Sequence, residues 1–389
     1  MLLCRARFRA RIPEGGDLNH DPDRMKIGVA GCGTISAAYL QTLRSFPSLE
    51  VVACADSVLA RAQATAAEFA IDRVCSSAKE LFADGEVELV LNLTPPRAHA
   101  AVSLAALVAG KHVYCEKPLG VDRGEGRRLV VEAAQRGLRL ASAPDTFLGP
   151  GWQRARALVD GGAIGRPLGL RASMLCPGPE GWHPNPAAFY QVGGGPMLDM
   201  GVYYLTALVF LLGPIRRVSG LTTIGVPELV IGSGPNKGQR LPVETPTHIA
   251  GALEFEAGAI GTIMTSFETA ESEFVLELYG TEGMLALPDP NCFDGELRIH
   301  RHGRVEPVSS LPTHPPELGR GLGVADLASA IRSGRPHRAS GELALHVLDA
   351  MLGFVDSRSC GCRYELKYRC EQPAALEDDE VANWLADTA

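Results

Sequence analysis

The stretch Ile27-Gly-Val-Ala-Gly31-Cys-Gly33-Thr-Ile-Ser36 decides the fold of this chain. It joins a short apolar segment, typical of a buried strand, to a glycine-rich turn and then to helical spacing from Thr34 to Leu43. Gly31 permits a tight turn, Gly33 lets a ligand approach the backbone, and the small Ser36 lets helix and strand pack closely. The pattern predicts a turn that binds a pyrophosphate at the N-terminus of a helix.

Strand and helix patterns continue to alternate after this turn. Apolar runs interleave with segments of helical spacing, at residues 51–55, 59–69, 78–83, 89–93, 99–109, 113–115 and 123–136. Such alternation predicts right-handed βαβ units around a parallel sheet. We therefore expect an α/β protein whose residues 25–147 form a Rossmann domain, a doubly wound parallel sheet that binds NAD(P).

The rhythm changes after Pro150. Helical patterns and β-rich runs then follow one another with short turns between the runs, at residues 152–160, 168–174, 196–212, 218–224, 247–255, 259–268, 273–279, 323–332 and 341–356. Meandering strands of this kind are typical of antiparallel pairing. We expect residues 148–389 to form a second α/β domain with an open, mostly antiparallel sheet.

Composition excludes several classes of function. The net charge of −8 and the lack of a concentrated basic face argue against nucleic acid as a partner. No apolar run approaches the roughly 20 residues that span a bilayer. Residues 1–24 are arginine-rich but lack the apolar core of an export signal, so we expect a disordered N-terminal extension on a cytoplasmic protein. An organelle transit peptide is the alternative for this segment.

The 10 cysteines are scattered through a large chain, which predicts reduced thiols rather than a disulfide scaffold. Cys360, Cys362 and Cys370 are close enough in sequence to suggest metal ligands. Their spacing is not that of a structural zinc site, however, and no fourth ligand is evident. We therefore expect loop and strand thiols, and no metal.

Asp56 ends the second expected strand, 25 positions after Gly31. An acid at this place can accept hydrogen bonds from the adenosine ribose hydroxyls and repels a 2′-phosphate. NAD is therefore the predicted cofactor. NADP is the alternative, because the nearby Arg61 could accept the phosphate, and Asp56 could instead be a turn or capping residue.

The tripeptide Glu116-Lys-Pro118 places a lysine beside the predicted nucleotide site. The proline fixes its own φ and restricts the lysine before it, so that the ammonium is held in place. A cation held in this way polarises a carbonyl or lowers the pKa of a neighbouring hydroxyl. Asp199 and Tyr203 lie four positions apart and so share one face of a helix. Their structural alternatives are an acid on the helix dipole and a core tyrosine.

Together these motifs resemble the glucose–fructose oxidoreductase / inositol dehydrogenase / MocA (Gfo/Idh/MocA) oxidoreductase family, over nearly the whole chain from Lys26. The resemblance is carried by Gly31-Cys-Gly-Thr-Ile-Ser36, Asn92-Leu-Thr-Pro-Pro-Arg-Ala-His99, Glu116-Lys-Pro118 and Gly193-Gly-Gly-Pro-Met-Leu-Asp-Met-Gly201-Val-Tyr203. Many members carry a histidine four residues after the active-site aspartate. This chain has Tyr203 there, so it looks like the tyrosine-bearing branch.

The resemblance implies a nicotinamide cofactor, a substrate that is a sugar, polyol or cyclic diol or ketone, and a homodimer or homotetramer formed through the second domain. It implies Lys117, Asp199 and Tyr203 as catalytic residues, with Tyr203 as general acid/base and Lys117 lowering its pKa. The implied cofactor-binding residues are Gly31, Gly33, Thr34, Ile35, Asp56, Thr94, Pro95, His99 and Glu116.

The residues themselves add a substrate-binding prediction. Trp182, His183 and Asn185 lie in the loop just before the helix of Asp199, where aromatic side chains and a neutral donor suit a sugar or cyclic substrate, and an ordinary proline-rich loop is the equal alternative. Arg97 follows the third expected strand at the cofactor edge and is a further expected substrate contact.

Two other functions stay open. One is glycoside cleavage on the same fold, in which transient oxidation of a sugar by bound NAD enables elimination. The other is a non-catalytic sensor that binds nucleotide and a partner protein. The presence of Lys117 argues against the sensor.

Overall fold

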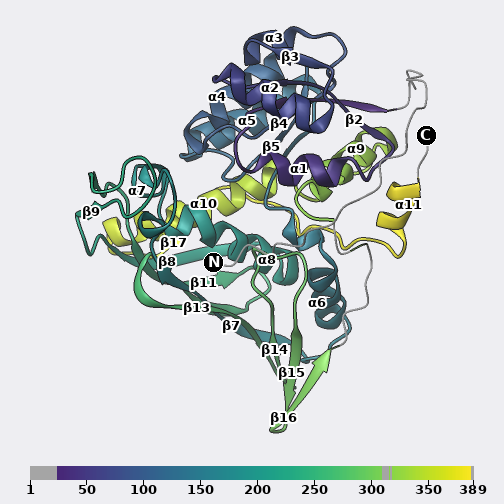
Figure 1. Cartoon of the computed structure of the whole chain (residues 1–389). Coiled ribbons are helices and arrows are strands. Elements are labelled where there is room, and N and C mark those ends of the chain that lie inside the picture. The colour runs from purple at the N-terminus through teal and green to yellow at the C-terminus, as the bar shows by residue number, and fades with distance from the viewer. Residues whose placement is uncertain (1–23, 309–314, 316–317, 387–389) are drawn as a thin grey trace.

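Figure 1 shows the computed structural model of the chain, which describes residues 24–308, 315 and 318–386. The predicted disordered extension over residues 1–24 lies outside these residues except for Arg24. Within the described ranges, no helix is both long enough and apolar enough to cross a membrane.

A six-stranded parallel sheet forms the N-terminal layer, in the order β3-β2-β1-β4-β5-β6. Its strands are β1 (Met25–Ala30), β2 (Leu49–Ala55), β3 (Arg73–Cys75), β4 (Leu89–Asn92), β5 (His112–Cys115) and β6 (Leu140–Ser142). This is the strand order of a Rossmann fold, whose switch point lies between β1 and β4. The sheet is buried on both faces, as parallel sheets require, and the predicted parallel fold is confirmed.

Helices connect these strands at or near the predicted positions. They are α1 (Ser36–Leu43), α2 (Leu59–Phe69), α3 (Ala78–Ala83), α4 (Pro96–Val108) and α5 (Arg123–Arg136). The bounds of α5 show how the local sequence sets a helix. Asp122 caps its start by accepting a hydrogen bond from the Glu125 amide (2.9 Å), and Gly137, at a φ of 65°, ends it in the left-handed conformation.

The second sheet has nine strands within the described residues, in the order β16-β15-β14-β13-β7-β12-β11-β8-β17. They are β7 (Pro167–Pro177), β8 (Ile215–Thr223), β11 (His248–Phe255), β12 (Ile260–Ser266), β13 (Glu268–Gly280), β14 (Met284–Ala286), β15 (Leu297–Arg301), β16 (Arg304–Val308) and β17 (Tyr364–Glu365). Only the β7–β12 pair is parallel. The prediction of a mostly antiparallel sheet is confirmed.

Helices cover one face of this second sheet (Figure 1). The fully buried α8 (Val202–Leu212) and the long α10 (Gly341–Cys360) pack together, and α10 also contacts β8. The same α10 touches α5 and β6, while α9 (Leu322–Ser333) touches α1 and β6. The C-terminal part of the chain therefore packs against both sheets.

Smaller elements complete the described part. They are α6 (Pro150–Asp160), α7 (Ala187–Tyr190), α11 (Glu380–Ala386), the turns η1 (Thr146–Leu148) and η2 (Pro179–Gly181), and the separate pair β9 (Glu228–Val230) and β10 (Arg240–Pro242).

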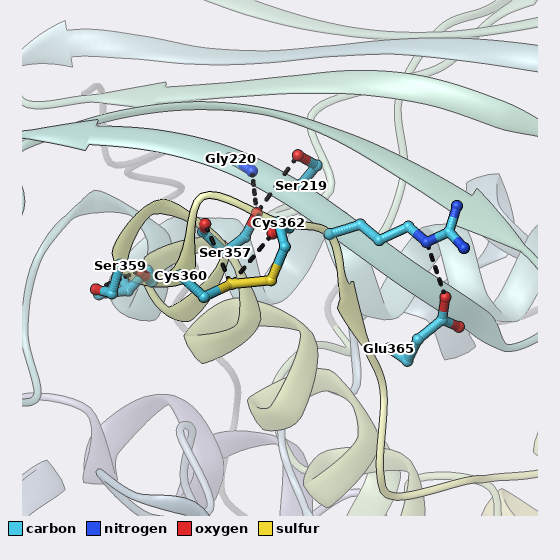
Figure 2. The surroundings of a disulfide bond; sticks show 9 residues. Ser219, Gly220, Ser357, Ser359, Cys360, Cys362 and Glu365 are labelled. Carbon is cyan, nitrogen blue, oxygen red and sulfur yellow. Dashed lines mark hydrogen bonds and ion pairs between the residues drawn. A yellow bond between two sulfur atoms is a disulfide. The ribbon is translucent and has the colours of Figure 1, made fainter.

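One pair of cysteines corrects the prediction of reduced thiols. Cys360 and Cys362 form a disulfide at the end of α10 (Figure 2). Gly361 between them has a φ of 63°, which reverses the chain and leaves the two Cα atoms 5.3 Å apart, within the span of a disulfide. The Ser357 hydroxyl donates to the Cys362 carbonyl (2.7 Å) and accepts from the Gly220 amide (3.2 Å), so this turn is tied to β8. Cys370 is not part of the disulfide and keeps its thiol.

Candidate active site

Lys117 reaches from the first sheet to the second domain. It follows β5, in a turn whose Lys117–Pro118 peptide is cis, and its Nζ donates to the Asp199 carboxylate (2.8 Å) and carbonyl (2.7 Å). Burial lowers the pKa of Lys117, but the charge of Asp199, with Tyr203 and Glu116, outweighs burial and raises that pKa above its usual range. Lys117 is therefore a fixed cation at neutral pH.

Tyr203 lies beside this cation. Its ring centroid is 5.1 Å from the Lys117 Nζ, and its side chain is buried in the first turn of α8. Burial raises the pKa of the Tyr203 hydroxyl, whereas Lys117 and Arg320 lower it, and the net direction is upward. The sequence argument expected a lowered pKa, because it counted the lysine and not the loss of solvent.

Asp199 and Tyr203 leave the same face of one helical segment, although that segment is not a regular α-helix. The π-helical turn η3 (Met197–Gly201) precedes α8, and single π turns of this kind are frequent at functional sites. Gly195 just before it has a φ of 89°, and a side chain there would meet the Pro246 carbonyl at 2.8 Å. A glycine is therefore required where the helix begins.

Buried polar contacts fix the turn that carries Lys117. The Glu116 carboxylate accepts hydrogen bonds from the Lys117 amide (2.6 Å) and the Tyr39 hydroxyl (3.1 Å). The two ring nitrogens of His99 face the carbonyls of Pro118 (2.7 Å) and Thr94 (2.6 Å).

His99 is consequently a structural cation. Burial lowers its pKa, but Cys115, the Pro118 carbonyl and Glu116 raise that pKa to about 9. Because carbonyl oxygens only accept hydrogen bonds, both ring nitrogens must carry protons to satisfy them. His99 thus ties the turn after β4 to the turn after β5.

The sequence argument missed Arg320 and Asn291. Arg320 Nη2 donates to the Tyr203 hydroxyl (3.2 Å) and to Asn291 Oδ1 (2.7 Å). Asp145 holds the loop before α9, since its carboxylate accepts from the amides of Gly321 (2.8 Å) and Gly323 (3.0 Å). The only signal in the sequence is an arginine flanked by glycines, at Gly319-Arg-Gly321.

The glycine-rich turn has the shape that a dinucleotide needs. Gly31 has a φ of 102°, and a Cβ there would lie 2.7 Å from the backbone of Leu93. A Cβ on Gly33 would meet no atom within 4 Å, so this residue faces open space at the start of α1. Thr34 is exposed and Ile35 half-buried beside it. The residues fit a pyrophosphate resting on a helix N-terminus.

Asp56 stands at the end of β2, half-buried. Its carboxylate accepts hydrogen bonds from the amides of Cys32 and Val58, both at 2.8 Å. These bonds aim the acid at the glycine-rich turn, and a carboxylate has further lone pairs for ribose hydroxyls. Arg61 is exposed on α2.

Two more predicted residues flank the switch point between β1 and β4. The Thr94 hydroxyl donates to the buried Asn92 Oδ1 (2.6 Å), and Pro95 is exposed immediately before α4. Arg97, on the first turn of α4, reaches the second domain, because its Nε donates to the Val192 carbonyl (3.1 Å).

Among the described residues, the remaining predicted substrate residues contact one another and not Lys117. Trp182, 53% exposed, packs against His183, which in turn contacts Phe189, with ring centroids 5.5 and 4.9 Å apart. The Asn185 amide donates to His183 Nδ1 (3.1 Å). These residues form a separate local cluster in the loop after β7. As far as the described residues go, no group of three or more His, Cys, Asp or Glu side chains is placed to hold a metal ion.

Two protein-family models match this chain. Residues 25–143 match a family model described as an oxidoreductase family with an NAD-binding Rossmann fold, and residues 152–286 match the GFO/IDH/MocA C-terminal domain. The trans-1,2-dihydrobenzene-1,2-diol dehydrogenase of Bos taurus is 29% identical over 314 residues, which cover 79% of this chain and 87% of that protein. The 1,5-anhydro-D-fructose reductase of Ensifer adhaerens is 28% identical over 350 residues, which cover 87% of this chain and 98% of that one.

A solved structure shares the fold. Levoglucosan dehydrogenase in complex with NADH and L-sorbose superposes with a TM-score of 0.77 at 20% identity, over 89% of this chain and 99% of that one.

Proposed function

The chain belongs to the GFO/IDH/MocA family of oxidoreductases, and from this membership we propose that it transfers a hydride between nicotinamide and a carbon atom of a sugar, polyol or cyclic diol or ketone. The observation that carries the proposal is the contact of Lys117, in the domain that holds the glycine-rich turn, with both Asp199 and Tyr203 of the second domain.

The proposed roles follow from the charges. A nicotinamide bound at this site supplies the hydride acceptor for oxidation or the hydride donor for reduction. In alcohol oxidation the substrate hydroxyl gives its proton to the Tyr203 oxygen, and in carbonyl reduction Tyr203 gives the proton back. Lys117 donates to the reacting oxygen and stabilises the phenolate, while Asp199 fixes the ammonium position.

The raised pKa of Tyr203 bears on whether reduction or oxidation is favoured. A hydroxyl that keeps its proton at neutral pH is ready to act as the acid in carbonyl reduction. We therefore infer that reduction is favoured near neutral pH and that oxidation gains as the pH rises.

Asp56 supports a preference for NAD(H). Its carboxylate lies at the end of β2 and is aimed at the glycine-rich turn by the Cys32 amide. A negative charge there accepts hydrogen bonds from ribose hydroxyls and repels the 2′-phosphate of NADP(H). The other proposed cofactor contacts are Gly31, Gly33, Thr34, Ile35, Thr94, Pro95, His99 and Glu116.

The substrate class rests on the relatives, whose names describe a cyclic diol and an anhydro sugar. We also propose that the chain belongs with the tyrosine-bearing members, because Tyr203 stands where many members carry a histidine. Arg97 and the cluster of Trp182, His183 and Asn185 are proposed to contact the more distant part of the substrate.

The uncovered face of the second sheet supports a homo-oligomer. Leu221 on β8 is 74% exposed, and Ile260 and Met264 on β12 are 61% and 38% exposed. Leu221 and Met264 pair with Ala250 of β11 from its two sides, so all three lie in one row on the same face of the sheet, opposite to α8 and α10. Exposed apolar side chains in one row are typical of an interface, and we propose a second copy of this chain as the occupant.

One experiment tests the function. A panel of sugars, polyols, cyclic diols and their ketones is incubated with NAD(H) or NADP(H), and the nicotinamide absorbance is followed. Turnover with at least one ring-shaped alcohol or ketone is expected. Release of a free sugar from a glycoside without net change in absorbance would instead identify the glycoside-cleaving reaction. No turnover and no release in the whole panel would contradict the proposal.

A further inference from the structure

Arg320 contacts the proposed active site but has no role in the mechanism proposed above. It lies in the loop before α9, and its guanidinium carbon is 5.9 Å from the centroid of the Tyr203 ring. Its Nη2 donates to the Tyr203 hydroxyl at 3.2 Å. The guanidinium thus contacts the atom that is proposed to exchange the proton.

Arg320 is half-buried, and the atoms that its guanidinium bonds are neutral. Its hydrogen bonds run to two neutral oxygens, those of Tyr203 and Asn291, and no carboxylate of the described residues forms an ion pair with it. A buried guanidinium is normally paired with an acid, because an unpaired buried charge is costly. Of the two described oxygens that the guanidinium bonds, the Tyr203 oxygen is the one that can ionise, so the charge of Arg320 acts on it directly.

The loop that presents Arg320 is held rigidly. Asp145 accepts hydrogen bonds from the Gly321 and Gly323 amides, and a Cβ on Gly323 would come within 2.5 Å of the Tyr114 hydroxyl. Asn291 fixes the guanidinium itself, at 2.7 Å. The position of the cation is therefore set before any ligand binds.

We propose that Arg320, positioned by Asn291, stabilises the ionised form of Tyr203 and so acts with Lys117 in proton transfer. The inference rests on the proposed function of Tyr203. Because the Tyr203 oxygen accepts its hydrogen bond from Arg320, its own proton is left for the substrate oxygen. When Tyr203 gives that proton to the substrate oxygen in reduction, two cations, Lys117 and Arg320, stabilise the phenolate that remains.

The other charges near this hydroxyl act in both directions. Lys117 and Arg320 lower the pKa of Tyr203, whereas burial and the Glu116 carboxylate raise it. Asp199 acts through Lys117, which it holds. Asp145 and Asp289 lie close enough to Arg320 for its charge to lower the pKa of each carboxyl, although burial raises both.

The test reads Tyr203 directly. 3-Fluorotyrosine, whose phenol is more acidic than that of tyrosine, is incorporated at position 203 of the full chain and titrated by ¹⁹F NMR, with and without NADH. We expect Arg320→Gln to move this titration upward by about one pH unit, and Asn291→Ala to move it upward by less. Arg320→Lys should titrate between the wild type and Arg320→Gln, because lysine keeps the positive charge but lacks the planar guanidinium that bonds Tyr203 and Asn291 together. Unchanged titrations in both Arg320→Gln and Asn291→Ala would overturn the proposal, as would Arg320→Lys titrating like Arg320→Gln.

A measurement of activity against pH distinguishes a failure of this inference from a failure of the proposed function. With an active substrate, kcat/KM for oxidation is measured against pH for the wild type and for Arg320→Gln, both with ordinary tyrosine at position 203. The pH at which this activity rises should be higher in Arg320→Gln than in the wild type, by the same amount as the ¹⁹F titration moves. Tyr204→Phe, which removes the neighbouring buried hydroxyl, should leave this pH unchanged. A shifted ¹⁹F titration in a protein that turns over no substrate would leave the effect of Arg320 standing and reject the proposed function. A shifted titration with no change in the pH at which activity rises would remove Arg320 from proton transfer.

Discussion

The Lys117 ammonium bonds two oxygens of a single residue, the carbonyl and the carboxylate of Asp199, at 2.7 and 2.8 Å. The lysine follows the fifth strand of the first sheet, and the aspartate lies in the π turn before α8 in the second domain. The Lys117 ammonium is therefore held by the domain that does not carry the glycine-rich turn.

Lys117→Ala should lower kcat by about 10²-fold or more, because it removes the cation beside Tyr203 and leaves the Asp199 charge unpaired. Lys117→Arg should be a poor rescue, since a guanidinium differs in shape from an ammonium. Steady-state kinetics with the best substrate of the panel measure both. Lys111, which donates to the Asp84 carbonyl (2.8 Å) in the same domain, is the matched control. Lys111→Ala should retain near-normal turnover, and equal losses in both alanine variants would argue for a general loss of fold.

Tyr203→Phe should lower kcat by about 10²-fold or more and leave the affinity for NAD(H) nearly unchanged. Because the pKa of Tyr203 is raised, alcohol oxidation by the wild type should increase with pH through neutrality and into the alkaline range. That dependence should disappear in Tyr203→Phe and persist in Tyr204→Phe. The measurement is kcat/KM against pH for all three proteins. Full turnover in Tyr203→Phe would remove this tyrosine from the mechanism and leave Asp199 as the group to test.

Asp56→Asn should shift the ratio of NADP(H) to NAD(H) affinity upward by about tenfold, which is ~1.4 kcal/mol, because it removes the charge that repels a 2′-phosphate. Asparagine keeps an oxygen for one of the two amides that Asp56 now accepts from. Titrations of both cofactors by nicotinamide fluorescence give the ratio. Asp72→Asn changes an exposed acid of the same domain and should leave it unchanged. A wild type that binds NADP(H) as tightly as NAD(H) would mean that Asp56 does not face the ribose.

His99→Gln should flatten the pH dependence of stability between about pH 6.5 and pH 9. The pKa of His99 is raised to about 9 in the folded chain, against about 6.5 in the unfolded chain. Its stabilisation is thus complete below about pH 6.5 and is lost as the pH rises through 9, on the order of 3 kcal/mol in all.

Urea denaturation at several pH values measures this effect. His112 provides the control, because burial and Arg139 lower its pKa, so that His112→Gln should change the pH dependence of stability only below about pH 6.5. A wild type with constant stability from pH 6.5 to 9 would show that His99 is neutral in the fold.

Met264→Asp and Leu221→Asp should each dissociate the homo-oligomer, because they place a carboxylate in the exposed apolar row of the second sheet. Light scattering after size exclusion measures the mass. Val131→Asp, on the exposed side of α5, is the control and should keep the wild-type mass. A wild type that is monomeric at micromolar concentration would refute the proposed interface.

Much of the fold was predictable because its periodicities are local. The helices at residues 59–69, 78–83 and 123–136 have the predicted bounds, and the motif at Gly31 to Ser36 lies between β1 and α1. The short strands β3 and β6 were not predicted, since three residues carry too little periodicity. Pairing with neighbouring strands creates them.

The site was predictable only where a motif marked it. The structure brings together Lys117, Asp199 and Tyr203, which stand in recognisable patterns. Arg320 reaches Tyr203 from 117 positions away in sequence, so no local pattern links them. The direction of the Tyr203 pKa also depends on burial, which is a property of the packed molecule. The disulfide at Cys360 depends on the backbone of Gly361 in the same way.

The packing of α9 and α10 against the first sheet has a consequence for how the protein is made. Ser142 donates its amide proton to the Ala339 carbonyl (2.9 Å), and Ala141 forms a bridge with Ser340. The last strand of the Rossmann sheet is thus synthesised roughly 200 residues before the segment that covers it, a delay of about 10–40 s at 5–20 residues per second. During that interval the nascent nucleotide-binding layer has an uncovered edge on the ribosome. The order of synthesis therefore leaves this edge of the first sheet exposed until the segment around Ala339 and Ser340 has been made.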